Sequence, residues 1–253
     1  MSAPGGPRRA PGAIAALAQL WAVFARELAA FFLSPMSYLV WAVFLVAAGY
    51  LFATGVRDGG PATMSQTFTS MGMLLLFVAP LLTMRLVAEE AKLGTLESLL
   101  TDPVGDATVV AGKYLAAVGF FAAMLAPTWA FPAILAALGQ PDPGPVLAGY
   151  LGLLLMGALF LAVGVLTSAA TANQIAAAAT SFTVILLSWG MGRAADSLGP
   201  GPGRDFLDYV SAFRRYDAFR HGLVDTRSVV FFVSVAAFAL LAATRALGLR
   251  RLQ

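Results

Sequence analysis

The sequence contains no cysteine and only one histidine among its 253 residues. Without cysteine, the chain has no disulfides, no thiolate metal ligands, no S-palmitoylation and no cysteine nucleophile. Charged residues are also scarce, at 11% of the chain against about 25% in soluble domains. So few charges cannot cover a globular surface with hydrated side chains, so we expect lipid to be the main solvent of this protein.

Hydrophobic residues make up 59% of the chain and gather in long runs. Each run is near the length of about 20 residues that a helix needs to cross a bilayer. Only helices suit such runs, because every backbone amide in hydrocarbon needs a partner within its own segment. The sequence predicts an all-α integral membrane protein with one transmembrane domain, 14–253, and six spans at about 36–56, 68–87, 113–138, 146–168, 173–192 and 229–247.

The region before the first span divides into a tail and a helix. Residues 1–13 are rich in proline, glycine and small side chains, which predicts a disordered tail. The next apolar stretch is similar to the core of a signal peptide, but Arg26 and Glu27 interrupt it and no convincing cleavage site follows. We predict a helix at 14–33 that lies in the headgroup region, with its aromatic side chains facing the acyl chains.

The basic residues predict the orientation in the membrane. An even number of spans places both termini on one side, and that side carries nine of the 16 lysine and arginine residues. Because cytoplasmic loops are enriched in these residues, we expect both termini in the cytoplasm. The same loops account for the net charge of +3, so we expect no nucleic-acid partner.

The segment between the second and third spans, 85–103, holds six charged residues in a chain that otherwise avoids charge. Residues 95–101 predict a short amphipathic helix with three leucines on one face and Glu97 on the other. Such a helix suits a groove on another protein, and it equally suits a connector that lies on the membrane surface. These two interpretations are open from the residues alone.

The same segment resembles the cytoplasmic signature of ABC-2-type transporter permeases. Further matches at Ser34-Pro35, Met84-Arg85 and 149–152 are most similar to the gliding-motility-associated permease subfamily, although Ala91 stands where members often have a basic residue. The matching residues of the segment are Glu89, Glu90, Lys92, Gly94, Thr95, Leu96, Glu97, Leu99, Leu100 and Pro103.

The resemblance implies that these residues form a coupling helix seated on a separate ATP-hydrolysing subunit. It also implies a second permease chain, identical or homologous, export across a bacterial inner membrane, and short outer helices at 193–228 before the last span. An accessory protein with an outer domain is a further implied partner. The chain has no phosphate-binding loop, because Gly112-Lys113 lacks the earlier glycine and the hydroxyl. We therefore expect no cofactor on this chain, no enzymatic activity of its own, and ATP with Mg on the partner subunit.

Polar residues in and beside the spans have two interpretations. They line a substrate path, or they form hydrogen bonds between helices, worth about 0.6 kcal/mol on average. We expect no charged residue in the middle third of a span, which argues against a carrier driven by protons or sodium. The candidate pathway residues are Gln66, Thr69, Asn173, Gln174 and Thr183.

Two functions from other classes compete with transport. An intramembrane protease would need histidines inside the membrane beside Glu89 and Glu90, but the only histidine, His221, is predicted in a loop. For the same reason we expect no metal site. A structural subunit that anchors an ATPase without moving a substrate would show the same coupling segment, so this alternative stays open.

Overall fold

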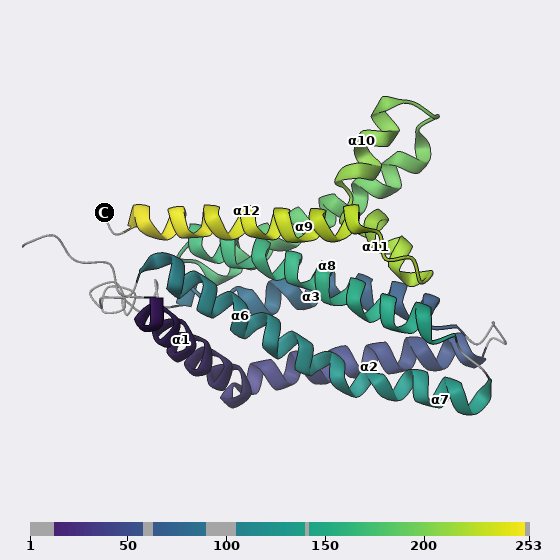
Figure 1. Cartoon of the computed structure of the whole chain (residues 1–253), viewed down its shortest axis with the longest axis horizontal. Coiled ribbons are helices and arrows are strands. Elements are labelled where there is room, and N and C mark those ends of the chain that lie inside the picture. The colour runs from purple at the N-terminus through teal and green to yellow at the C-terminus, as the bar shows by residue number, and fades with distance from the viewer. Residues whose placement is uncertain (1–12, 58–62, 90–104, 140–141, 251–253) are drawn as a thin grey trace, which may run out of the picture.

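A computed structural model describes residues 13–57, 63–89, 105–139 and 142–250 of the chain. Within these residues the secondary structure is entirely helical (Figure 1). The long helices are α1 (Ala13–Leu33), α2 (Pro35–Arg57), α3 (Ser65–Thr83), α6 (Asp106–Leu125), α8 (Pro143–Ala170), α9 (Gln174–Ser197) and α12 (Thr226–Arg250). The shorter ones are the 3-10 helix η1 (Ala126–Trp129), α7 (Ala130–Leu138), α10 (Pro202–Val210) and α11 (Ala212–Arg220).

Seven helical stretches of the described chain are long and apolar enough to cross a membrane. Six of them correspond to the predicted spans, which confirms an all-α membrane protein. The seventh, Ile14–Leu33, is the helix that the sequence predicts in the headgroup region. Length and composition therefore allow seven membrane-spanning helices where the sequence predicts six. The count is six if α1 lies along the membrane surface and seven if α1 crosses it.

Helix α1 meets α2 at a sharp joint and runs obliquely to it (Figure 1). Only Ser34 separates the two helices, and Pro35 follows it at the first position of α2. Proline keeps the preceding residue out of the helical region, so α1 ends there. The Ser34 carbonyl then accepts hydrogen bonds from the amides of Ser37 and Tyr38, at 3.1 and 3.4 Å, which starts α2.

Two spans extend five residues or more beyond their predicted limits, and α3 ends at Thr83, four residues before its predicted end. The third begins at Asp106, seven residues before the predicted start at Lys113. An aspartate in the first turn is favourable because it faces the positive end of the helix dipole. This span is also divided into α6, η1 and α7, since Pro127 cannot donate the backbone hydrogen bond of a regular α-helix. Helix α9 continues five residues past the predicted limit at Gly192, to Ser197.

Helix α8 forms the centre of the bundle. It packs against α3, α6, α9, α11 and α12, whereas α1 packs mainly along α6. Glycines allow α3 to approach α8 closely: a side chain at Gly149 would overlap the ring of Phe68, and one at Gly164 would overlap Thr83. Small residues serve this purpose in membrane helices, where association depends on close packing.

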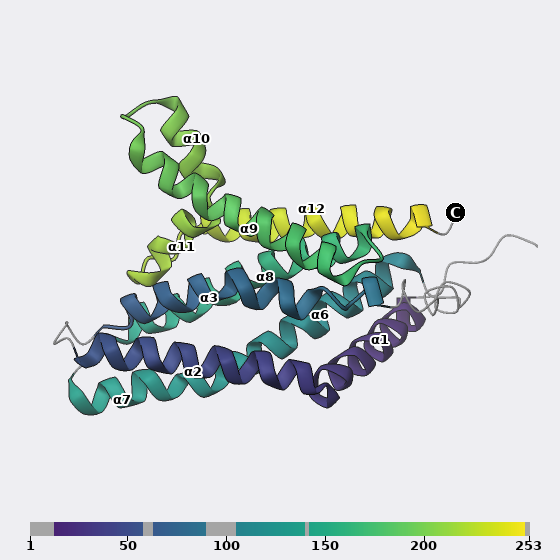
Figure 2. The same ribbon diagram turned by 180° about the vertical axis from the view of Figure 1, so that it is seen from behind.

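The bundle has two ends that differ in structure (Figures 1 and 2). At the α6 end, α6 begins and both α8 and α12 finish. At the α11 end, α3 and α8 begin and α7 finishes. Helix α9 runs toward the α11 end but diverges from the bundle, and α10 stands away from the other helices beside the last turns of α9 (Figure 2). Helices α10 and α11 occupy the connection for which the sequence predicts short helices.

Candidate functional site

The end of α3 is joined to the α1–α2 joint by Arg85. Its Nε lies 2.8 Å from Oε2 of Glu89, and its Nη1 donates to Oγ of Ser34 at 3.2 Å. Both charged side chains of this pair are more than one third exposed, so the pair contributes little stability by itself. Its structural effect is to hold Glu89, the last described residue before the 90–104 segment, beside the joint.

A second ion pair joins α6 to α1 at the same end of the bundle. Nζ of Lys113 lies 3.1 Å from Oε1 of Glu27, and the Lys113 side chain is only 1% exposed. Because the helix starts earlier than predicted, Lys113 lies two turns inside α6 instead of at its first residue. Arg26, which is largely exposed, shares the same carboxylate oxygen at 2.8 Å. A buried lysine requires such a partner, because burial without one is costly.

Ser168 of α8 connects the turn after α3 to the core. Its Oγ accepts from the amides of Val87 and Ala88, each at 3.1 Å, and donates to the Met84 carbonyl at 3.2 Å. A pocket of about 110 Å³ lies beside this turn, lined by residues of α1, α2, α3 and the connections that follow α1 and α3. Its lining residues include Glu27, Ser34, Arg85 and Glu89. We call the residues Glu27, Ser34, Arg85, Glu89 and Lys113 the α6-end cluster.

The predicted coupling residues lie almost entirely outside the described part of the chain. Glu89 is described, and it belongs to the α6-end cluster. The chain leaves the described structure after Glu89, a member of this cluster, and returns at Gly105, directly before α6, which carries Lys113 two turns further on. The predicted residues that lie outside the described structure are Glu90, Lys92, Gly94, Thr95, Leu96, Glu97, Leu99 and Leu100.

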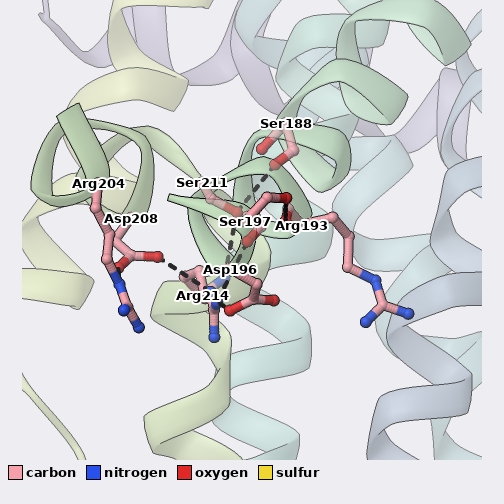
Figure 3. A network of polar contacts seen from close by, with 9 residues as sticks. Ser188, Arg193, Asp196, Ser197, Arg204, Asp208, Ser211 and Arg214 are labelled. Carbon is pink, nitrogen blue, oxygen red and sulfur yellow. Dashed lines mark hydrogen bonds and ion pairs between the residues drawn. The ribbon is translucent and has the colours of Figure 1, made fainter. Parts of the chain in front are cut away.

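At the α11 end, polar contacts fix α10 and α11 to the last turns of α9 (Figure 3). Arg214 pairs with Asp196 of α9, and its Nε lies 3.1 Å from Oδ1 of Asp208 in α10. Ser211 caps α11 by accepting from the Arg214 amide and donates to the Ser188 carbonyl at 2.9 Å. One arginine thus connects α9, α10 and α11.

Helix α11 is also attached to the start of α3. Nη1 of Arg220 donates to Oγ of Ser65 at 3.3 Å and to Thr69, while its Nη2 lies 2.8 Å from Oδ1 of Asp217. The hydroxyl of Tyr216 donates to the Phe68 carbonyl at 3.3 Å. Burial raises the pKa of Tyr216 well above its ordinary value, so this hydroxyl keeps its proton. Helix α3 therefore contacts α11 at one end and the α6-end cluster at the other.

A pocket of about 260 Å³ lies between α3, α9 and α11. Thr69 and Met73 of α3 line one wall, Trp189 and Arg193 of α9 another, and Phe213 is among the residues of α11. The guanidinium carbon of Arg193 lies 5.5 Å from the centre of the Trp189 ring. In Figure 3 its side chain points away from the network around Arg214. We call this space the α9–α11 pocket.

The predicted pathway residues are not brought together. Asn173 caps α9 by accepting from the amide of Ile175 at 2.9 Å, and Gln174 follows it, both at the α6 end. Thr183 is exposed and donates to the carbonyl of Ala179 within α9. Gln66 and Thr69 begin α3 at the opposite end, where Gln66 is exposed and only Thr69 lines a pocket described here.

The structure adds candidate functional residues whose partners the sequence does not indicate. Glu27, Lys113 and Ser168 each appear as ordinary polar residues near predicted helix limits, and their partners lie more than 80 residues away. The spacing of Trp189 and Arg193, four residues apart on one helix, is the one local signal for the α9–α11 pocket. The described residues contain no group of three histidine, cysteine or acidic residues that could hold a metal ion.

Comparison with known proteins adds one match. Residues 52–253, most of the chain, match the model of a family described as ABC-2 family transporter protein. The matched region extends from the last turns of α2 to the end of the sequence. It includes the α9–α11 pocket and, from the α6-end cluster, Arg85, Glu89 and Lys113, whereas Glu27 and Ser34 precede it. No curated protein matches the chain.

Proposed function

Because the chain belongs to the ABC-2 family of transporter proteins, we propose that it is the permease subunit of an exporter powered by a separate ATP-hydrolysing subunit. Family membership implies both the membrane and pairing with such a subunit. In our proposal residues 88–101 form the contact with the ATPase, and the α6-end cluster transmits movement of that contact to the membrane helices.

The attachment of the 90–104 segment supports this proposal most directly. The segment leaves α3 beside Arg85, which binds both Glu89 and Ser34, and it rejoins the chain at α6. Lys113 of α6 is paired in turn with Glu27 of α1. A displacement of the segment would therefore act on α1, α2, α3 and α6 together. Such an arrangement suits a coupling element better than a connector at the membrane surface, which needs no buried ion pair beneath it.

We further propose that six helices cross the bilayer and that α1 lies in the headgroup region. The oblique course of α1 supports this, as do Arg26 and Glu27 in its second half. Trp21 is 67% exposed and Leu17 65%, as expected for side chains that dip into the acyl boundary. Both termini and the 90–104 segment then lie on the cytoplasmic side of a bacterial inner membrane.

The working assembly that we propose has two permease chains and two ATPase subunits, with the pathway between the permeases. ATP and Mg would bind to the ATPase subunits. The sequence resemblance to gliding-motility-associated permeases, at Ser34-Pro35 and Met84-Arg85 among others, supports a role beside an accessory protein with an outer domain. In this structure both pairs lie at the α6-end cluster, where Ser34 and Arg85 bind each other.

The experiment is co-purification of this chain with its ATPase subunit from the native membrane. Changing Leu96, Leu99 and Leu100 together to serine should abolish or strongly weaken the complex, since each fully buried leucine contributes about 1.5–3 kcal/mol. The matched control changes three exposed leucines at the α11 end to serine: Leu138, Leu147 and Leu198. An intact complex after the first change, or loss of the complex after the control, would contradict the proposed contact.

A second variant separates assembly from coupling. If Glu97 meets a cation of the ATPase away from water, its removal leaves that charge unpaired at a cost of about 2–5 kcal/mol. An exposed local pair would be worth only about 0–1 kcal/mol. We therefore expect Glu97→Ala to leave the chain inserted and to change the ATPase rate of the assembled complex strongly, with Glu97→Gln intermediate. An unchanged rate would make Glu97 a hydrated surface residue.

A further inference from the structure

The α9–α11 pocket combines aromatic and apolar walls with arginine side chains. Trp189, Met73 and Phe213 provide the apolar surface, and each comes from a different helix. Arg193, Arg214 and Arg220 line the same space, together with Asp196 and Asp217. Apolar walls with a few charged groups at fixed positions are the usual composition of a binding site for a small molecule.

The three arginines differ in whether they form ion pairs. Arg214 pairs with Asp196 and Asp208, and Arg220 pairs with Asp217 and donates to Thr69. Arg193 forms no ion pair with any residue in the described part of the chain, and its guanidinium lies over the Trp189 ring. A guanidinium stacked in this way keeps its N–H donors, which lie in its own plane, available to a carboxylate or phosphate. Within the described part of the chain, the pocket thus has one arginine without an acidic partner.

The position of Arg193 on α9 selects the type of anion. Helix α9 is a candidate span, and the apolar residues Phe182 and Leu186, seven and three residues before Trp189, lie on the same face of the helix as the Trp189 ring. Arg193 lies one turn after Trp189, near the C-terminal end of the apolar part of α9. An apolar chain can therefore lie along the Trp189 side of the pocket while its charged head reaches Arg193. A small hydrophilic anion would leave the apolar walls in contact with water.

We propose that the α9–α11 pocket binds an anionic amphiphile, with the carboxylate or phosphate on Arg193 and the apolar chain against Trp189, Met73 and Phe213. This inference rests on the proposed function, because it names the substrate class of that transporter. The pairs around Arg214 and Arg220 shape the pocket by holding α11 against α9 and α3. Arg193 acts as the residue that selects for negative charge.

Quenching of tryptophan fluorescence tests the proposal on the complex of this chain with its ATPase subunit in nanodiscs. The probe is 9,10-dibromostearate, whose bromines quench nearby indole rings, and its neutral methyl ester is the matched ligand control. The chain has four tryptophans, so the contribution of Trp189 is the difference between the parent and Trp189→Phe. We expect saturable quenching that depends on Trp189 and is absent with the ester.

Variants of Arg193 then test the charge. We expect Arg193→Gln to weaken binding of the acid about tenfold, because a hydrogen bond between charged groups is lost. Arg193→Lys should retain part of the affinity. Arg227→Gln is the control, since this exposed arginine at the start of α12 does not line the pocket. Equal binding of acid and ester, or no effect of Arg193→Gln, would overturn the proposal.

Competition distinguishes the sources of the anion. Displacement of the probe by oleoyl-lysophosphatidate but not by oleoyl-lysophosphatidylcholine would support a phosphate head on an amphiphile, and displacement by oleate alone would support a carboxylate head. Displacement by inorganic phosphate at equal concentration would contradict the need for an apolar chain and overturn the proposal. Retention of the ATPase subunit by Arg193→Gln shows that any loss of binding concerns the pocket. Loss of that subunit in the parent would contradict the proposed function instead.

Discussion

Nζ of Lys113 lies 3.1 Å from Oε1 of Glu27, which joins α6 to α1 across 86 positions of the sequence. The side chains are 1% and 12% exposed, so both charges are held away from water. Removing one partner of such a pair is expensive, whereas replacing both by apolar residues is often neutral. The pair therefore fixes the position of α1 on α6 without necessarily adding stability to the fold.

A double-mutant cycle tests this pair. We expect Glu27→Leu to lower the free energy of unfolding by about 3–5 kcal/mol, because Lys113 loses a buried carboxylate. The double change Glu27→Leu with Lys113→Met should recover most of the loss. Reversible unfolding in mixed micelles measures both. Arg26→Gln is the control, since that exposed pair is worth about 0–1 kcal/mol, and additive losses in the cycle would show that the two residues do not interact.

The attachment of α11 to α3 predicts a local effect. Changing Arg220 to methionine removes its hydrogen bonds to Ser65 and Thr69, and hydrogen bonds to charged groups contribute about 1.5–3 kcal/mol. We expect faster amide hydrogen exchange in α11 and in the first turn of α3, with exchange at the α6 end unchanged. Arg215→Met is the control, because Arg215 lies over Tyr209 and Phe231 instead. Unchanged exchange in α11 would show that Tyr216 and packing suffice to hold it.

Two glycines, Gly164 in the contact between α3 and α8 and Gly190 in an open position on α9, should respond differently to an added methyl group. An added methyl group at Gly164 would overlap Thr83, whereas one at Gly190 has open space around it. We expect Gly164→Ala to destabilise by about 1–3 kcal/mol through overpacking. Gly190→Ala should be neutral or stabilise by up to about 1 kcal/mol, since alanine favours helix. Thermal unfolding of the two variants side by side measures the difference, and equal midpoints would mean that α3 shifts freely along α8.

Cysteine labelling determines the number of spans, because the chain offers no background thiol. Under the six-span topology, Ser2→Cys, Ser98→Cys and Gln253→Cys should react with an impermeant maleimide only after cells are permeabilised. Gly60→Cys and Ser197→Cys should react in intact cells. A seventh span at α1 would place Ser2 and Gln253 on opposite sides, so unequal labelling of these two would replace the six-span topology. Labelling of Ser98 and Ser197 from the same side would contradict both.

Local sequence patterns predict the membrane class and most helix positions. Runs of apolar residues near Phe44, Leu153 and Ala236 are continuous in the sequence, and membrane helices form their backbone hydrogen bonds within the run itself. The oblique joint at Ser34-Pro35 is similarly local. Helix starts are predicted less well where the first turns are polar and hydropathy does not mark them, as at Asp106, which begins α6 seven residues before the predicted limit.

The candidate sites depend on contacts that no local pattern contains. Glu27 meets Lys113 because α1 packs along α6, and Ser168 meets the turn at Val87 because α8 packs against α3. Among the proposed pathway residues, Thr69 lines the α9–α11 pocket because α11 folds back onto the start of α3, while Asn173 caps a helix at the other end.

The sequence by itself determined that this chain is a helical membrane protein, that its family is that of ABC-2 transporters, and where the charged segment between α3 and α6 lies. Hydropathy and short motifs suffice for these properties, since each depends on residues that are close in the chain. Only the tertiary structure decided which charges are neutralised and which stay available. Arg214 and Arg220 resemble Arg193 in the sequence, yet packing of α10 and α11 brings carboxylates to the first two and an indole ring to the third.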